Sequence, residues 1–171
     1  MSTISRPRTK HRFRDSRSTA YEFLGDIRVV CPRCTRSAHV LMVTGAPEPE
    51  QRPLFAPRRL TCLHCGLTKT KASRHLVFPL GTTRGMTDPY FGHPLLLQTE
   101  TRHGWLWAYN PQHLTLVRSY VAASLRERAP WYDTGQKMTL VARLPAWVKH
   151  AKNRDEVLHA IDRIRTSLVA N

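Results

Sequence analysis

Two pairs of cysteines, Cys31-Pro-Arg-Cys34 and Cys62-Leu-His-Cys65, have the spacing at which a tight turn presents two thiolates to one metal ion. They use up the 4 cysteines of the 171-residue chain. Four thiolates complete a tetrahedral shell for structural zinc and leave no position for a reactive water. The sequence therefore predicts one structural Zn²⁺ bound by Cys31, Cys34, Cys62 and Cys65. Thiol redox chemistry or two disulfides is the alternative use of these residues.

The charge balance points to a polyanionic partner. Lys and Arg number 27 against 12 Asp and Glu, which gives a formal net charge of +15 and a sequence pI near 10.7. Such an excess favours DNA, RNA or an anionic membrane surface as a partner. Solubility alone is the competing explanation, but it seldom requires so one-sided a balance. We therefore expect nucleic acid, DNA or RNA, as the partner.

The N-terminal residues 1–19 form a basic arm with few apolar side chains. Such a segment cannot bury enough surface to fold alone, so we expect it to be disordered. It is either a solvated terminus or an arm that follows phosphates and becomes ordered on binding. The candidate phosphate contacts in it are Arg6, Arg8, Lys10, Arg12 and Arg14.

Residues 20–80 have the element order of a zinc ribbon. A strand around residues 27–30 leads into the first cysteine pair, and residues 38–43 continue as a second strand. A proline-rich loop over residues 45–57 follows. Residues 58–61 then enter the second pair, Gly66 suits a left-handed turn, and residues 67–77 are expected to form the return strand.

The runs VVCPRC and LTCLHCG resemble the zinc ribbon of TFIIB-type zinc-ribbon-containing proteins, over roughly residues 27–77. The resemblance implies a fold and a metal but no single activity, because ribbons recur in transcription, replication and translation machines. The C-terminal run LPAWVKHAKNRDEVLHAI is similar to segments of uncharacterised bacterial proteins with such ribbons. That second likeness implies no mechanism.

Basic residues cluster in sequence around the cysteine pairs. We expect them to form a cationic face that follows a phosphate backbone. The alternative is a solvated strand edge on which lysines block edge-to-edge pairing. The candidate contacts are Arg33, Arg36, Arg58, Arg59, Lys69, Lys71 and Arg74.

Residues 81–171 are expected to hold a β-hairpin and two to three helices, which makes the chain an α+β protein. The hairpin strands cover residues 94–100 and 105–109, and Gly104 suits their turn. Asn110-Pro111 is a helix start, a short helix is expected over about residues 136–143, and a capping-box-like start at Asn153 opens an amphipathic last helix. The sequence leaves open whether this part packs with the ribbon as one unit.

Three aromatic residues, Trp105, Trp107 and Tyr109, share one face of the second hairpin strand. Exposed, they would be a stacking platform for unpaired bases. Buried, they would be the core face of the hairpin, and this interpretation is favoured because aromatic residues at strand spacing usually belong to a core.

The resulting hypothesis is a zinc-stabilised protein that binds nucleic acid, alone or as an accessory part of a transcription, replication or translation machine. The second hypothesis is an interaction module that docks on a larger protein or ribonucleoprotein complex. The third is a metal-dependent nuclease using Asp88, Glu100 and His103, although no catalytic motif marks them. Neither a secretory signal nor a membrane-spanning stretch is visible, so we expect a cytoplasmic protein with no membrane partner, a location that allows association with the nucleoid or the ribosome.

Overall fold

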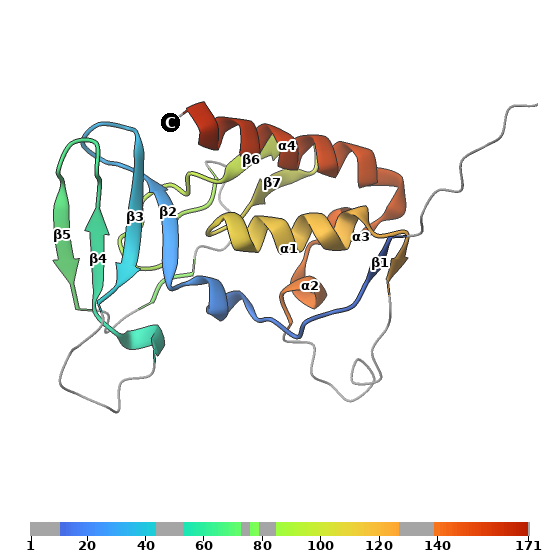
Figure 1. The fold of residues 1–171 in the computed structure, drawn as a ribbon, viewed down its shortest axis with the longest axis horizontal. Coiled ribbons are helices and arrows are strands. Elements are labelled where there is room, and N and C mark those ends of the chain that lie inside the picture. Colours follow the sequence, from blue (N-terminus) through green and yellow to red (C-terminus); the bar gives the residue numbers. More distant parts are fainter. Residues whose placement is uncertain (1–10, 44–52, 73–75, 79–84, 127–138, 171) are drawn as a thin grey trace, which may run out of the picture.

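The computed structural model describes residues 11–43, 53–72, 76–78, 85–126 and 139–170, and the statements below concern these ranges. Four of the predicted phosphate contacts, Arg6, Arg8, Lys10 and Arg74, lie outside them, as do residues 136–138 of the expected short helix. The described chain is a mixed α/β fold in which a sheet lies at one side and the helices at the other (Figure 1).

The main sheet is an antiparallel meander of four strands in chain order: β2 (Asp26–Val30), β3 (Ser37–Met42), β4 (Arg58–Thr61) and β5 (Thr68–Lys71). Its register places Val40 opposite both Ile27 and Leu60, and all three are buried on the inner face. The expected return strand ends early, at Lys71, because all four side chains of β5 are exposed and none contributes to the core. A short 3₁₀ turn, η2 (Pro53–Phe55), interrupts the expected loop.

The C-terminal part begins with a hairpin of β6 (Gln98–Thr101) and β7 (Gly104–Trp107). Helix α1 (Pro111–Ala122) follows at the expected Asn-Pro start, where the side chain of Asn110 accepts a hydrogen bond from the amide of His113. Two single-turn helices, α2 (Leu140–Arg143) and α3 (Ala146–Lys149), lead through η4 (Ala151–Asn153) to the long helix α4 (Arg154–Ala170).

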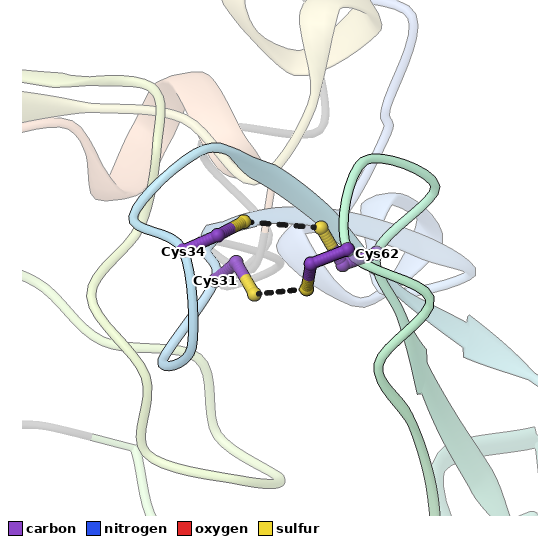
Figure 2. A group of neighbouring side chains, drawn as sticks. Cys31, Cys34 and Cys62 are labelled. Carbon is purple, nitrogen blue, oxygen red and sulfur yellow. Dashed lines mark hydrogen bonds between the residues drawn. The ribbon is translucent and has the colours of Figure 1, made fainter.

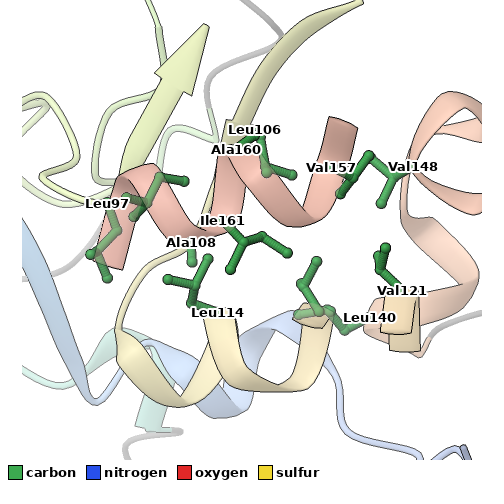
Figure 3. Close-up of a cluster of buried hydrophobic side chains, with 12 residues drawn as sticks. Leu97, Leu106, Ala108, Leu114, Val121, Leu140, Val148, Val157, Ala160 and Ile161 are labelled. Atoms are coloured by element: carbon green, nitrogen blue, oxygen red, sulfur yellow. The ribbon is translucent and has the colours of Figure 1, made fainter. Parts of the chain in front are cut away.

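One apolar cluster joins the hairpin to these helices (Figure 3). Leu106 and Ala108 enter it from the hairpin side, Leu114 from α1, and Val157 and Ile161 from α4. The 3.6-residue spacing of apolar side chains along α1 and α4 is therefore explained by burial against one another and against the hairpin.

The sheet and the C-terminal part share hydrogen bonds and a second apolar cluster. The amide of Arg28 in β2 donates to the carbonyl of Tyr109 at 2.8 Å, and the amide of Leu96 donates to the carbonyl of Arg28 at 3.0 Å. Tyr90, Leu95 and Tyr109 pack in the same cluster as the inner face of the sheet. The free edge of β2 is thus covered by the chain that leads into and out of the hairpin.

The expectation that residues 1–19 are entirely disordered is wrong for residues 11–19. Strand β1 (Arg12–Phe13) pairs in parallel with β8 (Leu125–Arg126), and the buried ring of Phe13 lies 5.4 Å from that of Tyr120. The buried carboxylate of Asp15 accepts a hydrogen bond from the hydroxyl of Thr139. These anchors order the segment that leads to η1 (Ala20–Phe23).

Candidate metal centre and its cationic surroundings

Each cysteine pair sits on a turn, which we call a knuckle: the first (Cys31–Cys34) joins β2 to β3 and the second (Cys62–Cys65) joins β4 to β5. In both knuckles, the residue after the second cysteine has a left-handed backbone conformation, with φ 62° at Thr35 and 69° at Gly66. Its amide donates back to the carbonyl of the first cysteine, at 2.9 and 3.0 Å. Glycine adopts this conformation without strain, whereas a β-branched threonine does not. The two knuckles therefore share one backbone design, and the first is the more strained.

The four sulfur atoms converge at one point between the knuckles (Figure 2). The Sγ atoms of Cys31 and Cys65 lie 3.7 Å apart, those of Cys34 and Cys62 lie 3.6 Å apart, and all four fall within 4.8 Å of one another. Zinc–sulfur bonds of about 2.3 Å at tetrahedral angles place sulfurs about 3.8 Å apart. A disulfide needs about 2.05 Å. The geometry therefore fits one tetrahedral metal ion, and the cysteines are free thiols.

The surroundings of the thiols favour a thiolate at Cys31. Burial raises the pKa of Cys31, but hydrogen bonds from the backbone of Cys34 and Arg33 outweigh it and bring the pKa to about 7. The backbone at Arg36 acts to lower the pKa of Cys34, yet burial and the three neighbouring thiols raise it to about 12. A divalent cation would hold all four cysteines as thiolates, because metal binding releases the protons of the thiols.

The knuckle tips are exposed to solvent. Cys31 and Cys62 are buried, whereas Cys34 and Cys65 are half-buried and Leu63 is 87% exposed. The guanidinium of Arg36 lies 3.2 Å from Nδ1 of His64 and so links one knuckle to the other. This cross-knuckle contact was missed by the sequence reasoning, because the two residues are far apart along the chain.

One predicted phosphate contact is wrong: Arg58 is only 2% exposed. Its guanidinium donates to the carbonyl of Leu24 at 3.0 Å and to the hydroxyl of Tyr90 at 2.6 Å, and it lies over the Tyr90 ring at 4.2 Å. Burial lowers the pKa of Arg58, and the proximity of Tyr90 offsets part of that effect. Arg58 therefore stabilises the interior and is not available to a phosphate.

The remaining predicted basic residues do not share a single face of the sheet. Lys69 pairs with Leu60 across the sheet, so it lies on the inner-face side of the edge strand, as does Lys71. Arg59 points to the opposite, outer face. The ammonium group of Lys71 also donates to the carbonyl of Tyr90 at 2.7 Å. The expected continuous face is thus split between the two sides of the sheet.

What these residues share is their place in two chain segments that contain no acidic residue. Residues 27–43 and 58–72, which hold both knuckles and most of the sheet, carry seven Lys and Arg and no Asp or Glu. The nearest acid in β2, Asp26, lies at the far end of that strand and pairs with His39 at 3.0 Å. The exposed basic side chains of this region, which we call the cationic end, are Arg33, Arg36, Arg59, Lys69 and Lys71. Two further predicted contacts, Arg12 and Arg14, are exposed on the ordered N-terminal segment.

The residues of the nuclease hypothesis do not form a metal site in the described part of the chain. The carboxylate of Asp88 is buried and accepts three backbone amides, from Tyr90, Phe91 and His93. His103 stacks on Trp147 at 5.5 Å and lies 3.6 Å from the carboxylate of Glu156. Among the described residues, the cysteines form the only group of three or more potential ligands.

The aromatic residues Trp105, Trp107 and Tyr109 differ in how deeply they are buried. Leu106 and Ala108 form the core face of the hairpin, and Tyr109 is also buried. Trp105 and Trp107 are half-buried on the other face. The prediction that these side chains are buried is therefore confirmed for Tyr109, whereas the two tryptophans are only half-buried.

Comparisons with protein-family models, with curated proteins and with solved structures each give no match to this chain. The helices of the described ranges include none whose length and apolarity would let it cross a bilayer. The site is therefore interpreted from its own geometry.

Proposed function

We propose that this protein binds nucleic acid, DNA or RNA, through the cationic end, which a structural zinc ion at Cys31, Cys34, Cys62 and Cys65 holds in shape. The observation that carries the proposal is the absence of acids from the two segments that build the metal centre, beside the five exposed cations of the cationic end. Phosphate contacts are made mostly by Arg and Lys side chains, and an acid-free surface attracts the backbone without local repulsion.

The metal itself contributes to this charge balance. Four thiolates around one divalent ion leave a net charge of about −2, because the ligands are deprotonated. Arg33 and Arg36 lie on the first knuckle and offset that charge locally. The exposed Arg59 and Lys69, together with the overall charge of +15, remain in excess. A surplus of this kind supports a polyanionic partner. The resemblance of this segment to a TFIIB-type zinc ribbon remains a proposal.

Protein docking receives less support from the described surface. Docking through the last helix calls for an apolar stripe on its exposed side, and the exposed side chains of α4 between Arg154 and Leu168 are polar. Leu63 at the tip of the second knuckle is one exposed apolar side chain, and single ones are common on protein surfaces.

The proposal is tested by measuring affinity for single- and double-stranded oligonucleotides over a range of salt. For phosphate contacts, the logarithm of the binding constant falls linearly with the logarithm of the salt concentration, by about 0.9 per phosphate on duplex DNA. A variant with Arg33→Gln, Arg36→Gln and Lys69→Gln should lower that slope by up to about 3, with zinc content unchanged.

A matched variant separates local contacts from bulk charge. Lys152→Gln, Arg163→Gln and Arg165→Gln remove the same charge from exposed positions on the helical side. The slope should then stay close to that of the unmodified protein. Equal slopes in both triple variants would show that the cationic end is not the interface, and absence of binding at low salt would refute nucleic-acid binding itself.

A further inference from the structure

A pocket of about 340 Å³ lies between η1, β7, α1 and the short helices α2 and α3. Its volume is within the range of small-ligand sites, about 300–1,000 Å³. None of the four cysteines lines this pocket, so it is a different site from the metal centre.

Aromatic side chains form part of the walls of the pocket, beside aliphatic ones. Trp105 and Trp107, the two half-buried tryptophans of β7, line it. Tyr21 and Phe78 line it as well, are exposed, and meet edge to face with centroids 6.0 Å apart. Flat π-faces around a small cavity favour a flat aromatic ligand, since each base stacked on an aromatic side chain adds a substantial part of single-strand affinity.

Two polar groups accompany these rings. Arg143 lines the pocket and is exposed, and no ion pair or hydrogen bond of its side chain occurs within the described part of the chain. His113 is buried in the wall and accepts the amide hydrogen of Tyr109 at Nδ1, 3.2 Å away. That bond fixes the neutral tautomer with its hydrogen on Nε2, an N–H donor without a partner among the described residues. Burial lowers the pKa of His113 to about 4, so the ring is neutral near pH 7.

We propose that this pocket binds one unpaired base of a single-stranded nucleic acid, with the adjoining phosphate at Arg143. The aromatic walls supply stacking, the buried imidazole supplies a hydrogen-bond donor to the base edge, and the exposed guanidinium supplies the counter-charge. None of the described lining residues is acidic. This inference rests on the proposed function and deepens it, because it assigns the single-stranded form as the preferred ligand.

The test compares two strands with the same phosphates: an oligothymidylate of about 12 nucleotides, within the site sizes of single-strand binders, and the same strand with abasic positions throughout. The unmodified protein should bind the base-bearing strand more tightly by about 5- to 150-fold, which corresponds to about 1–3 kcal/mol for one stacked base. Trp105→Leu keeps an apolar side chain but removes the indole face, so it should abolish this preference. Trp147→Leu, which removes a tryptophan outside the pocket, should keep it.

A second variant keeps the test decisive if Trp105→Leu disturbs the fold. Arg143→Gln should weaken binding of the base-bearing strand more than binding of the abasic strand, because only a base in the pocket fixes the adjoining phosphate at Arg143, whereas Arg165→Gln on α4 should not change the ratio of the two affinities. Equal affinity of the unmodified protein for both strands would overturn the pocket assignment while leaving the proposed function intact. Binding of neither strand at low salt would remove the proposed function. Tighter binding of free thymidine monophosphate than of the oligonucleotide would make the ligand a free nucleotide and overturn the single-strand assignment.

Discussion

Arg58 and Arg59 are neighbours of the same type, and we predict that their replacement by alanine has opposite consequences. Arg58→Ala removes two hydrogen bonds from a buried guanidinium, to Leu24 at 3.0 Å and to Tyr90 at 2.6 Å. It also removes the contact with the Tyr90 ring and leaves the carbonyl of Leu24 without this donor. Arg59→Ala removes an exposed side chain from the outer face of the sheet.

The magnitude follows from these contacts. Hydrogen bonds to a charged group contribute about 1.5–3 kcal/mol each, so two of them give a gross loss of about 3–6 kcal/mol. Relief of the guanidinium's desolvation, the effect that lowers the pKa of Arg58, offsets part of that loss. We therefore expect Arg58→Ala to lower the free energy of unfolding by about 2–4 kcal/mol, and Arg59→Ala to change it by at most about 0.5 kcal/mol.

Thermal and urea unfolding of the zinc-loaded protein measure this difference. For a chain of this length, about 2–4 kcal/mol corresponds to a fall in Tm of about 4–16 °C. Nucleic-acid affinity should fall for Arg59→Ala, and for Arg58→Ala only to the extent that the fold is lost. If Arg58→Ala unfolds like the unmodified protein while losing affinity, then Arg58 contacts the ligand and the buried arrangement described above is wrong.

Two further predictions concern a buried histidine and the metal ligands. Burial lowers the pKa of His113 from 6.5 to about 4, so the unfolded chain takes up a proton that the folded chain refuses as the pH falls from about 6.5 to about 4. The unmodified protein should lose about 3 kcal/mol more stability over that window than His113→Gln, and parallel curves from chemical denaturation would contradict the assignment. Cys62→Ser, or chelation, should speed hydrogen exchange in both knuckles and leave α1 and α4 protected, because zinc-binding energy is folding energy where the metal closes the structure. Unchanged exchange in the first knuckle of Cys62→Ser would show that the two knuckles do not share an ion.

Elements fixed by local chemistry could be predicted from the sequence. The knuckles follow from cysteine spacing, the start of α1 from Asn110 and Pro111, and the buried stripe of α4 from its helical periodicity. The pairings of β2 with β3 and of β4 with β5 also follow, because each knuckle forces its two strands to be antiparallel neighbours.

Features that depend on contacts with residues far along the chain could not be predicted from the sequence. Phe13 is ordered by a pairing with Leu125 and Arg126, far along the chain, and composition alone describes it as part of a disordered arm. The two faces of β7 are both apolar, so only tertiary packing decides that Leu106 is buried in the core and Trp105 is half-buried. Asn153 does not act simply as a local cap, since its side-chain amide donates to the carbonyl of Trp147 in α3.

Arg58 is a different case, because its burial had a signal in the sequence. It precedes Leu60 by two residues in a strand and therefore shares the inner face with it, whereas Arg59 does not. The prediction that Arg58 contacts a phosphate followed instead from the clustering of basic residues around the second cysteine pair. The alternation of side chains along a strand therefore distinguishes a buried arginine from its exposed neighbour better than the local density of basic residues does.

The most direct test of the account is the metal content of the unmodified protein, purified under reducing conditions and measured by native mass spectrometry. We predict a mass increase of one zinc ion per chain, with four thiols that react with an alkylating agent only after chelation or unfolding. A metal-free mass, with Cys31, Cys34, Cys62 and Cys65 freely alkylated or joined as disulfides, would contradict it.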